Sequence, residues 1–486
     1  MLAPTENHKR VLLLNPGKKN SSFDVGRMHM GLTLMSSLLR RAGHDVRLVD
    51  FAFLQSRPRP IPIPSVEETL RYFVPDVVGI SVFSYLFDEC KELVDRVAAC
   101  ARPTIILGGP HFTMFPSDFA LDRRIGFIVR GEAESVIEGL VNAKRPKDGP
   151  VFIEATPAKA EQIPPIDLGR ALGADLLENY QIQLSRGCPY SCSFCNISQM
   201  AGRRIRPRDL DACIREIVEA KSRYPCLRVV SITDDCPTYD KKRFKTFLRL
   251  FAKAGTGCLL TVDNMRADAI DDEMLALYKA AGGVNICLGV ESRDPLVFQG
   301  LSKGESLEQI EEAAKLVRKH ELSLGMCFVI GLPEDNMERH LRSVRFARRA
   351  APDYAFWNMC VPWPGTEVHR WYLEHGTVGD PRNFSTLIDP HLNFSDPTCE
   401  SPGFPKHLMV RAWLMANMET HDYFSLRDLP KMLGLVIRYR LFRSFFRFLL
   451  RRLPAAFYRG LMPESLRAHF RKRFPNAIAR IKMLLR

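Results

Sequence analysis

Three cysteines, Cys188, Cys192 and Cys195, lie within eight residues of one another in a segment that also contains Gly187 and Pro189. Thiols at this spacing can reach one iron–sulfur cluster without help from distant parts of the chain. A cubane cluster takes four ligands, which are usually Cys thiolates. No fourth ligand is evident nearby, so one iron atom would remain open to a small molecule. The spacing therefore predicts a [4Fe–4S] cluster with one available iron.

Two other interpretations of the cysteines are a zinc site and three buried thiols. Structural zinc is usually bound by pairs of Cys, or by Cys with His, at two separate places in the chain. The nearest histidines, His111 and His320, are far from the three cysteines in the sequence. Buried thiols rarely follow this spacing with Gly and Pro beside them. The cluster remains the preferred interpretation.

The C-x3-C-x2-C pattern, with the aromatic Phe194 before its last Cys, resembles the signature of the radical S-adenosylmethionine (SAM) enzymes. The resemblance implies that the open iron binds the amino and carboxylate groups of SAM. One electron from the cluster would then cleave SAM to a 5′-deoxyadenosyl radical. An electron donor such as flavodoxin or ferredoxin is therefore expected. The protein would position these groups and exclude water.

The segment from residue 176 to residue 375 alternates predicted strands and helices. Polar, Gly or Pro residues follow most of the strands, and in a parallel barrel these ends form one face where catalytic residues collect. The pattern predicts a partial (βα)6 barrel of the TIM type, which is also the fold that the resemblance implies. The six strands are predicted at 181–185, 229–233, 259–262, 284–290, 324–330 and 355–360.

The resemblance implies SAM contacts at the ends of the first two barrel strands. Phe194 matches an aromatic residue near the adenine, although packing within the loop would also explain it. Asp234 and Asp235 match the residues that meet the amino group, where many relatives have Gly-Gly-Glu. Adjacent carboxylates suit an ammonium group, and the alternative is a pair of solvated loop acids.

Further along, Glu291 and Ser292 match a stretch that contacts the ribose, and Gly331 and Pro333 match a stretch whose backbone passes the adenine. Arg206 matches a basic segment after the cluster loop. For Arg206 we prefer the interpretation as part of a solvated run of charges.

Residues 1–145 also alternate strand and helix signals. Short apolar runs at 11–14, 46–49, 77–80, 104–107 and 127–129 predict buried strands, and residues 30–41 have helical periodicity. This alternation predicts a doubly wound, Rossmann-like parallel sheet, whose ligand sites lie at the carboxyl ends of the strands.

Together with the cysteines downstream, this first region resembles the cobalamin-binding domain found in one branch of the radical SAM family. The D-x-H-x-x-G motif, which supplies a His ligand to cobalt in many such domains, is absent, and His29 is at the wrong spacing. The nucleotide tail of cobalamin would then be displaced, with no His from that motif on cobalt. We expect His111 to be structural. The residues matched to cobalamin are Asn15, Pro16, Ser81, Gly108, Gly109 and Gly131.

Residues 146–175 are rich in Pro, Ala and charge and are predicted to be a linker. Residues 376–486 are predicted to be a mostly helical extension that ends in a basic tail. From Pro430 to Arg486 there are 15 Lys or Arg side chains and one acid, so this segment has a net charge of +14. The net charge of the whole chain is also +14. The basic character therefore belongs to the tail.

Apolar residues of the tail recur at helical spacing beside a row of Arg. Such a helix can lie at the surface of an anionic membrane, which would suit a lipid-like substrate. Packing on the barrel with the Arg outward is the alternative, and the apolar stripe argues against nucleic acid as a partner. The residues are Phe442, Phe445, Phe446, Leu449, Leu450 and Leu453, with Arg440, Arg443, Arg447 and Arg451.

Composition and the first residues indicate where the chain works. The segment Met1–Glu6 lacks the features of a secretory leader, and no run of 18 apolar residues predicts a transmembrane helix. Most of the 13 cysteines are expected to be reduced. These features predict a cytoplasmic protein, with peripheral membrane contact through the tail.

Following the resemblance, the expected activity is that of a cobalamin-dependent radical SAM C-methyltransferase acting on an unactivated carbon of a small-molecule or lipid-like intermediate. Oxidation, cyclisation or rearrangement without methyl transfer is the nearest alternative, and an iron–sulfur or cobalamin sensor without turnover is another. A methylthiotransferase is disfavoured, because its first domain supplies three more cluster cysteines and here that region has only Cys90 and Cys100. The sequence does not identify the substrate.

Overall fold

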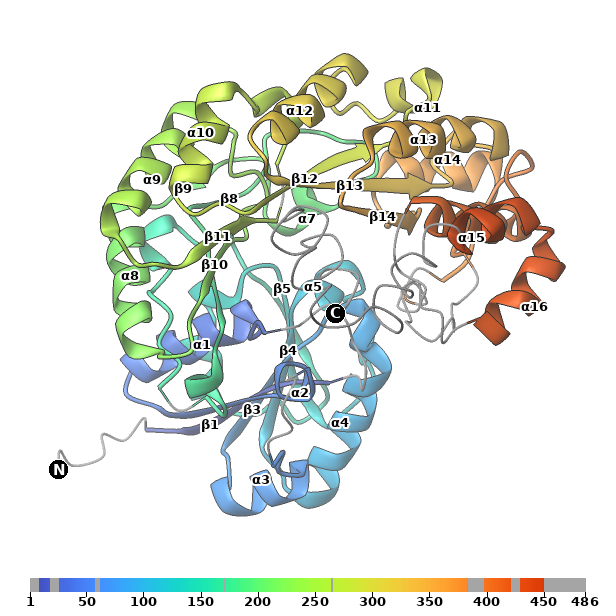
Figure 1. The fold of residues 1–486 in the computed structure, drawn as a ribbon. Coiled ribbons are helices and arrows are strands. Elements are labelled where there is room, and N and C mark those ends of the chain that lie inside the picture. Colours follow the sequence, from blue (N-terminus) through green and yellow to red (C-terminus); the bar gives the residue numbers. More distant parts are fainter. Residues whose placement is uncertain are drawn as a thin grey trace, which may run out of the picture.

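The structure is a computed structural model that describes residues 8–17, 26–56, 62–169, 171–263, 265–380, 382, 397–420 and 429–449. Within these ranges the chain forms a Rossmann-like domain, a barrel domain above it in the view of Figure 1, and helices that follow the barrel. The predicted α/β class and the order of the two domains are confirmed.

The first domain is built on six parallel strands in the order β2-β1-β3-β4-β5-β6. The strand order reverses at β1, and ligands of doubly wound sheets bind at the carboxyl ends of the strands near such a reversal. Residues 11–14 of β1 are fully buried because helices cover both faces of the sheet. The strands are β1 Arg10–Asn15, β2 Asp45–Asp50, β3 Val77–Ser81, β4 Thr104–Gly108, β5 Ile125–Arg130 and β6 Val151–Glu154.

The helices of this domain connect the parallel strands. The predicted helix at residues 30–41 is confirmed as α1, whose amino-terminal cap is His29. The others are α2 Phe51–Gln55, α3 Val66–Phe73, α4 Phe87–Cys100, α5 Pro110–Met114 and α6 Ile137–Asn142.

One part of the predicted linker belongs to the first sheet. Residues 151–154 form β6, which pairs with β5 in parallel register. Because β6 is a short edge strand with the apolar side chains Val151 and Phe152 exposed, it lacks the buried pattern of the inner strands. The residues after it are also packed, since Ile163 and Leu168 are buried. The first domain therefore extends beyond residue 145.

The second domain is the predicted partial barrel. Two three-stranded parallel sheets, in the orders β11-β10-β7 and β12-β13-β14, are joined by single bridges from Leu260 to Gly283 and from Met265 to Leu288. All six strands therefore run in one direction around the barrel. They are β7 Asn179–Ile182, β10 Val229–Ile232, β11 Leu259–Val262, β12 Asn285–Glu291, β13 Ser323–Ile330 and β14 Tyr354–Met359.

Helices cover the outside of the barrel (Figure 1). Several begin at a side chain that accepts a hydrogen bond from the first turn, such as Asp240 before α9 and Asn336 before α13. These helices are α8 Leu210–Arg223, α9 Lys241–Ala254, α10 Asp272–Ala280, α11 Pro295–Gln299, α12 Leu307–Lys319 and α13 Met337–Ala350, while the short helix α7 Ile197–Met200 lies on the side of the first domain.

The chain after the barrel is mostly helical as far as it is described. Helix α15 packs against α13 and β14, and residues 442–449 form a further helix. None of the helices in the described part is long and apolar enough to span a bilayer. The elements are α14 Glu367–His375, β15 Thr377–Val378, β16 Cys399–Glu400, α15 Lys406–Thr420 and α16 Leu429–Tyr439.

Part of the predicted amphipathic tail can be compared with the structure. Phe445 and Leu449 are partly buried against the core, whereas Phe442 and Phe446 are exposed. Arg447 forms an ion pair with Glu419 of α15 at 2.7 Å. Leu450, Arg451 and Leu453 lie outside the described residues.

Candidate active site

The three cysteines lie in the loop that follows the first barrel strand. Cys188, Cys192 and Cys195 all line one cavity of about 140 Å³. The loop is held from three sides: Cys188 N donates to Gly202 O at 3.1 Å, and Ser193 N donates to Leu301 O at 2.9 Å. The third contact is from Val368 N to Ser193 O, at 3.1 Å.

The protonation of the three thiols differs. A hydrogen bond with the neighbouring Cys236 lowers the pKa of Cys188 to about 7, whereas burial raises the pKa of Cys192 and raises that of Cys195 to about 11. In the described chain no three His, Cys, Asp or Glu side chains could hold a single metal ion. Each thiolate of a cubane cluster binds a different iron, so shared access to one cavity is what a cluster requires.

Asp234 and Asp235 follow β10 and differ in what they contact. Asp234 is buried and accepts hydrogen bonds from Leu184 N at 2.7 Å and from Ser185 Oγ at 2.6 Å. It lines neither the cysteine cavity nor the larger cavity described below. Asp235 lines the larger cavity and accepts from Gly187 N at 3.0 Å. The interpretation as a solvated acid is wrong for Asp234, whereas Asp235 is partly exposed and accessible to a ligand.

Glu291 and Ser292 end β12 and are both buried. Glu291 has a φ of +59° and lies 3.4 Å from Lys303 Nζ. Burial raises the pKa of Glu291, and the charge of Lys303 opposes that effect. Lys303 also affects the thiol of Cys192, since its charge favours the thiolate. Lys303 was not among the residues predicted from the sequence.

Gly331 and Pro333 follow β13. Gly331 has a φ of +81°, and a Cβ at this position would stand 2.2 Å from Met409. Its N–H donates to Asp335 at 3.0 Å, and its carbonyl accepts from the hydroxyl of Tyr372. Phe194 is partly buried and packs against the core. The backbone at Gly331 is therefore held in a conformation that favours glycine.

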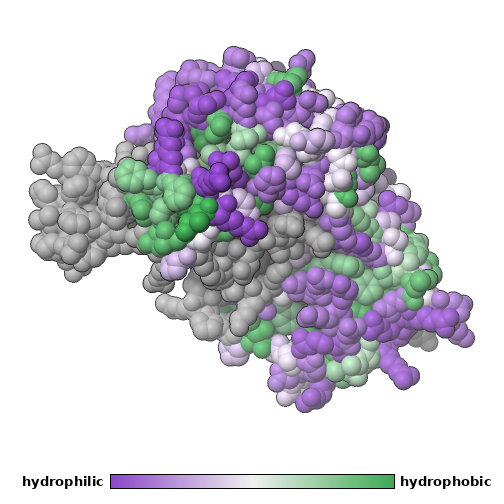
Figure 2. Space-filling model, turned by 90° about the vertical axis from the view of Figure 1, so that its right-hand side faces the viewer, coloured by the Kyte–Doolittle hydropathy of each residue, from purple (hydrophilic) through white to green (hydrophobic). Residues whose placement is uncertain are grey.

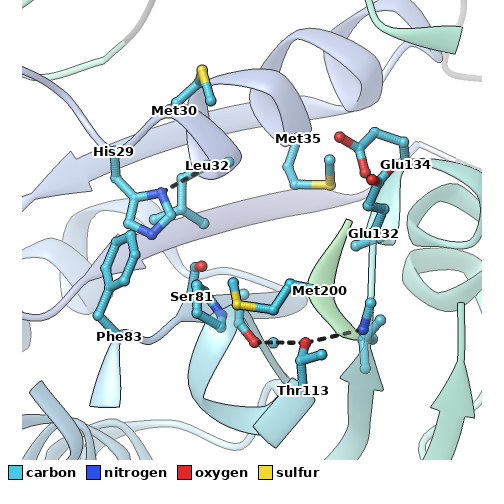
Figure 3. A pocket seen from close by; sticks show the side chains of 18 of the residues that line it. His29, Met30, Leu32, Met35, Ser81, Phe83, Thr113, Glu132, Glu134 and Met200 are labelled. Atoms are coloured by element: carbon cyan, nitrogen blue, oxygen red, sulfur yellow. Dashed lines mark hydrogen bonds between the residues drawn. The ribbon is translucent and has the colours of Figure 1, made fainter. Parts of the chain in front are cut away.

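A larger cavity, of about 400 Å³, lies where the carboxyl ends of the first sheet face the barrel. Figure 3 shows its thioether side chains Met30, Met35 and Met200, with Glu132 and Glu134 to one side. Met200 belongs to α7 of the barrel, which follows the cluster loop directly. The cavity is therefore formed by both domains and reaches the segment that carries the cysteines.

Four of the six residues matched to cobalamin line this cavity: Ser81, Gly108, Gly109 and Gly131. A Cβ on Gly109, whose φ is +96°, would stand 2.6 Å from Ser81 Oγ, so the turn allows no side chain. Asn15 and Pro16 do not line the cavity. Asn15 is buried and donates to Asp50 at 2.7 Å, so it holds the strand end in place.

Histidines near the cavity are neutral. His29 lines it, and Nδ1 of its ring accepts from Leu32 N at 3.3 Å. Burial lowers the pKa of His29 to about 4, so the ring is neutral. Because Nδ1 accepts a hydrogen bond, the proton is on Nε2, which has no hydrogen-bond partner among the described residues. His111 is buried between Ser84 Oγ at 3.1 Å and Asp118 Oδ2 at 3.0 Å, and it does not line the cavity.

Arg206 contradicts the interpretation as part of a solvated run. Its guanidinium is mostly buried and contacts both carboxylate oxygens of Glu132 in the first domain. Its neighbours Arg203 and Arg204 are exposed. Arg203, Arg204 and Arg206 look alike in the sequence, and only the contact with the first domain makes Arg206 mostly buried while the other two stay exposed. Glu132, Glu134 and Arg186, which share this contact, were also missed as site residues.

The chain matches two known families. The model of the B12 binding domain matches residues 28–141, and that of the Radical SAM superfamily matches residues 182–347. Among curated relatives are an uncharacterized methyltransferase of Pyrococcus horikoshii and the anaerobic magnesium-protoporphyrin IX monomethyl ester cyclase of Rubrivivax gelatinosus. The first is 25% identical and the match covers 81% of this chain and 89% of the relative; the second is 26% identical, with 74% and 69% covered.

Solved structures with a similar fold include the radical SAM methyltransferase TsrM from Kitasatospora setae with cobalamin and a [4Fe–4S] cluster bound. Its TM-score is 0.66 at 17% identity, and the match covers 87% of this chain and 92% of that chain. The cobalamin-dependent SAM radical enzyme OxsB has a TM-score of 0.61 at 15% identity, with 96% and 75% covered. At these sequence identities, the similarity to the two solved structures establishes only that the fold is shared.

The fold and the matched domains define a two-domain α/β enzyme with a B12 binding domain joined to a radical SAM barrel. The chain contains a B12 binding domain and a Radical SAM superfamily domain, and it is a radical SAM enzyme.

Proposed function

We propose that this enzyme is a cobalamin-dependent radical SAM C-methyltransferase that acts on an unactivated carbon of a small-molecule or lipid-like intermediate. One observation carries the proposal: the cavity over the B12 binding domain is continuous with the segment around the cluster loop, because Asp235, Arg186 and Met200 line it together with Gly108 and Gly109. A corrinoid and SAM placed in this enzyme would then face one shared space.

The residues present fit the expected cofactors. The Gly turns at 108–109 and 131 leave room for a broad ring at the sheet edge. The first sheet contributes the apolar side chains Leu13 and Ile106 to the cavity wall, which suits a displaced nucleotide tail. When bound, the cluster with SAM supplies a hydrogen-abstracting radical and cobalamin supplies a methyl group.

The side chains of this chain would position those groups. Cys188, Cys192 and Cys195 would hold the cluster, and Asp235 would accept from the amino group of SAM. Glu291 and Ser292 would lie near its ribose, and Gly331, Pro333 and Phe194 near its adenine. The mostly apolar lining around Met30 and Met35 would exclude water from the reacting centre.

Label transfer tests the proposal. The protein is reconstituted anaerobically with iron, sulfide and hydroxocobalamin, reduced, and given SAM with a deuterated methyl group and a small-molecule extract. We expect 5′-deoxyadenosine together with a product that is heavier by the labelled methyl. Release of 5′-deoxyadenosine with an altered but unlabelled product would overturn methyl transfer, and no 5′-deoxyadenosine would indicate a sensor.

Ring formation without methyl transfer is a second candidate function. The cyclase of Rubrivivax gelatinosus is as similar to this chain, at 26% identity, as the methyltransferase of Pyrococcus horikoshii at 25%. The label experiment distinguishes the two reactions, because a cyclised product loses hydrogen and gains no carbon.

An acidic electron-transfer protein such as flavodoxin or ferredoxin would reduce the cluster. Exposed Arg203 and Arg370 line the cysteine cavity, and the next residue after Arg203, Arg204, is also exposed. Complementary charge speeds the encounter of electron-transfer partners and is weakened by salt. We expect Arg203→Glu with Arg370→Glu to slow reduction by flavodoxin at least tenfold but not reduction by dithionite. Equal slowing with both reductants would contradict this docking surface.

Contact with an anionic membrane is supported by the helices near the end of the described chain. Leu433, Ile437, Phe442 and Phe446 are 47–64% exposed, while Met432, Val436 and Phe448 on the other side are buried. Exposed Arg438, Arg440 and Arg443 lie among them. Figure 2 views this side of the molecule, where apolar side chains gather beside hydrophilic ones. This arrangement suits a lipid surface.

Flotation with vesicles tests the membrane contact. We expect the protein to float with vesicles that contain phosphatidylglycerol but not with pure phosphatidylcholine, and Ile437→Ser with Phe446→Ser to reduce flotation at least fivefold. Leu121→Ser, which changes another exposed Leu in the first domain, is the control. Equal flotation of all proteins would contradict a role for these side chains.

A further inference from the structure

We propose that Glu132 and Glu134 of the B12 binding domain are positioning residues that hold the cluster loop in a set relation to the cobalamin cavity. With Arg186 and Arg206 of the barrel they form a four-residue contact, called here the interdomain clamp. The inference rests on the proposed function, in which a corrinoid and a cluster face one space.

The interdomain clamp is a closed set of ion pairs. Arg186 Nη1 lies 2.6 Å from Glu134 Oε1 and 3.1 Å from Glu132 Oε2. Arg206 contacts both oxygens of Glu132, at 2.7 Å through Nη1 and 2.5 Å through Nη2. Remaining donors are also used, since Arg206 donates to the carbonyls of Ala158 and Ala201. Two-pronged pairs between Arg and carboxylate restrict both distance and angle.

Burial makes this contact sensitive to position. The side chains of Glu132 and Arg206 are each 12% exposed, that of Arg186 is 7% exposed and that of Glu134 is 5% exposed. Removing one partner of a buried ion pair leaves the other without compensation for its lost hydration. The two domains can therefore shift at this point only by breaking several strong hydrogen bonds together.

One end of the interdomain clamp is continuous with the cluster loop. Arg186 pairs with Arg206 in the two-stranded sheet of β8 Ser185–Arg186 and β9 Arg206–Pro207, and Cys188 is two residues further on. The intervening Gly187 has a φ of +92°, and a Cβ there would stand 2.5 Å from Arg204 O. Because this backbone is so closely packed, a movement of Arg186 must also move Cys188.

The other end belongs to the cavity wall. Glu132 and Glu134 follow Gly131, whose N–H donates to Thr113 Oγ1 at 3.1 Å, and all four residues line the large cavity. Figure 3 shows Glu132 and Glu134 on the opposite side of that cavity from His29 and Phe83. The short loop of residues 131–134 thus lines the large cavity and also holds the segment that carries the first cluster cysteine.

A second contact between the domains provides a matched control. Arg27 pairs with Asp263 at 2.7 Å, and their side chains are 28% and 34% exposed. Asp263 lies at the end of β11 and lines neither the large cavity nor the cysteine cavity. Its loss removes one ion pair between the domains without touching the cluster loop.

Pulsed electron paramagnetic resonance tests the inference without substrate. The full chain is loaded with cluster and cobalamin, both are reduced to paramagnetic states, and their spin–spin coupling is measured. We expect a narrow distribution of couplings in wild type and in Asp263→Asn. In Glu134→Gln and in Arg186→Lys, which keeps the positive charge, the distribution should be at least twofold broader. Unchanged distributions in both clamp variants would overturn the inference.

Thermal unfolding of the same proteins separates positioning from stability alone. If both clamp variants have a lower melting temperature than wild type but the same narrow distribution of spin–spin couplings, the contact only stabilises the fold and the inference is wrong. If Glu134→Gln does not fold, Arg186→Lys and Arg206→Lys decide by the same two readouts. Failure of wild type to bind cobalamin would instead overturn the proposed function, so the two failures are distinguishable.

Discussion

The ammonium nitrogen of Lys303 lies 3.4 Å from a carboxylate oxygen of Glu291 and 2.9 Å from one of Glu305, and all three side chains are buried. Lys303 is thus one cation shared by two carboxylates. Burial lowers the pKa of Lys303 less than the two carboxylates raise it, so the net pKa is raised and the charge is retained. That charge also acts on Cys192 of the cluster loop.

Replacing Lys303 by Met should affect both stability and the cluster. Two buried carboxylates would lose their partner, which typically destabilises a protein by about 3–5 kcal/mol. Loss of a positive charge near Cys192 should also make the reduction potential of the cluster more negative. Chemical unfolding and a redox titration followed by electron paramagnetic resonance measure the two effects. Lys315→Met, which breaks an exposed pair with Glu312, should change neither; an unaltered potential in Lys303→Met would contradict the electrostatic account.

Each cluster cysteine should be required for iron. We expect each of the variants Cys188→Ala, Cys192→Ala and Cys195→Ala to lose most of the iron and sulfide that anaerobic wild type retains. A cluster with one open iron is held by only three thiolates, so each variant would leave only two. Iron and sulfide are assayed per chain. Cys100→Ala, which changes an exposed thiol, should keep the full content. Stoichiometric zinc in the anaerobic wild type would argue for a different metal site.

Filling the cavity at the sheet edge should prevent cobalamin binding. Gly108 lines the cavity. A Cβ added to Gly108 would stand 3.8 Å from the nearest atom of Val129, so a Leu side chain at this position would extend into the cavity. We expect Gly108→Leu to weaken binding of hydroxocobalamin at least tenfold with a similar melting temperature. Gly139→Leu, at an exposed position of α6 that does not line the cavity, should bind as wild type does. Equal affinities would show that the corrinoid site lies elsewhere.

Asp335 should make stability depend on pH. It is buried and accepts from the backbone N–H groups of Gly331 and Asn336, and burial raises its pKa to about 7. The folded state therefore holds the proton more tightly than the unfolded chain, whose carboxyl titrates near its ordinary value of 3.8. This contribution to stability is complete below pH 3.8 and is lost as the pH rises through 7.

The comparison with Asp335→Asn isolates this effect, because Asn does not titrate. The free energy of unfolding of wild type minus that of the variant should fall by about 1 kcal/mol per pH unit between pH 5 and 7. Urea unfolding at several pH values measures the difference. A difference that stays constant from pH 5 to 7 would show that the Asp335 carboxyl is ionised throughout this range, and a difference that rises with pH would also contradict the prediction.

Local patterns account for the elements that could be predicted. Residues 30–41 carry helical periodicity, and the helix has those bounds in the structure. The three cysteines could be predicted as cluster ligands for the same reason, since ligands within one short loop need no distant partner. Strand β6 was missed because an exposed edge strand of four residues has no buried pattern to detect.

The sequence by itself determined the order of the two domains, the alternation of strands and helices and the cluster loop, because each depends on residues close together along the chain. Only the tertiary structure decided that Asp234 is buried and occupied, that Asp235 faces the cavity, and that Arg206 meets Glu132, 74 positions away. Such contacts form when two domains approach one another, and the charge of a side chain does not reveal which distant partner will reach it.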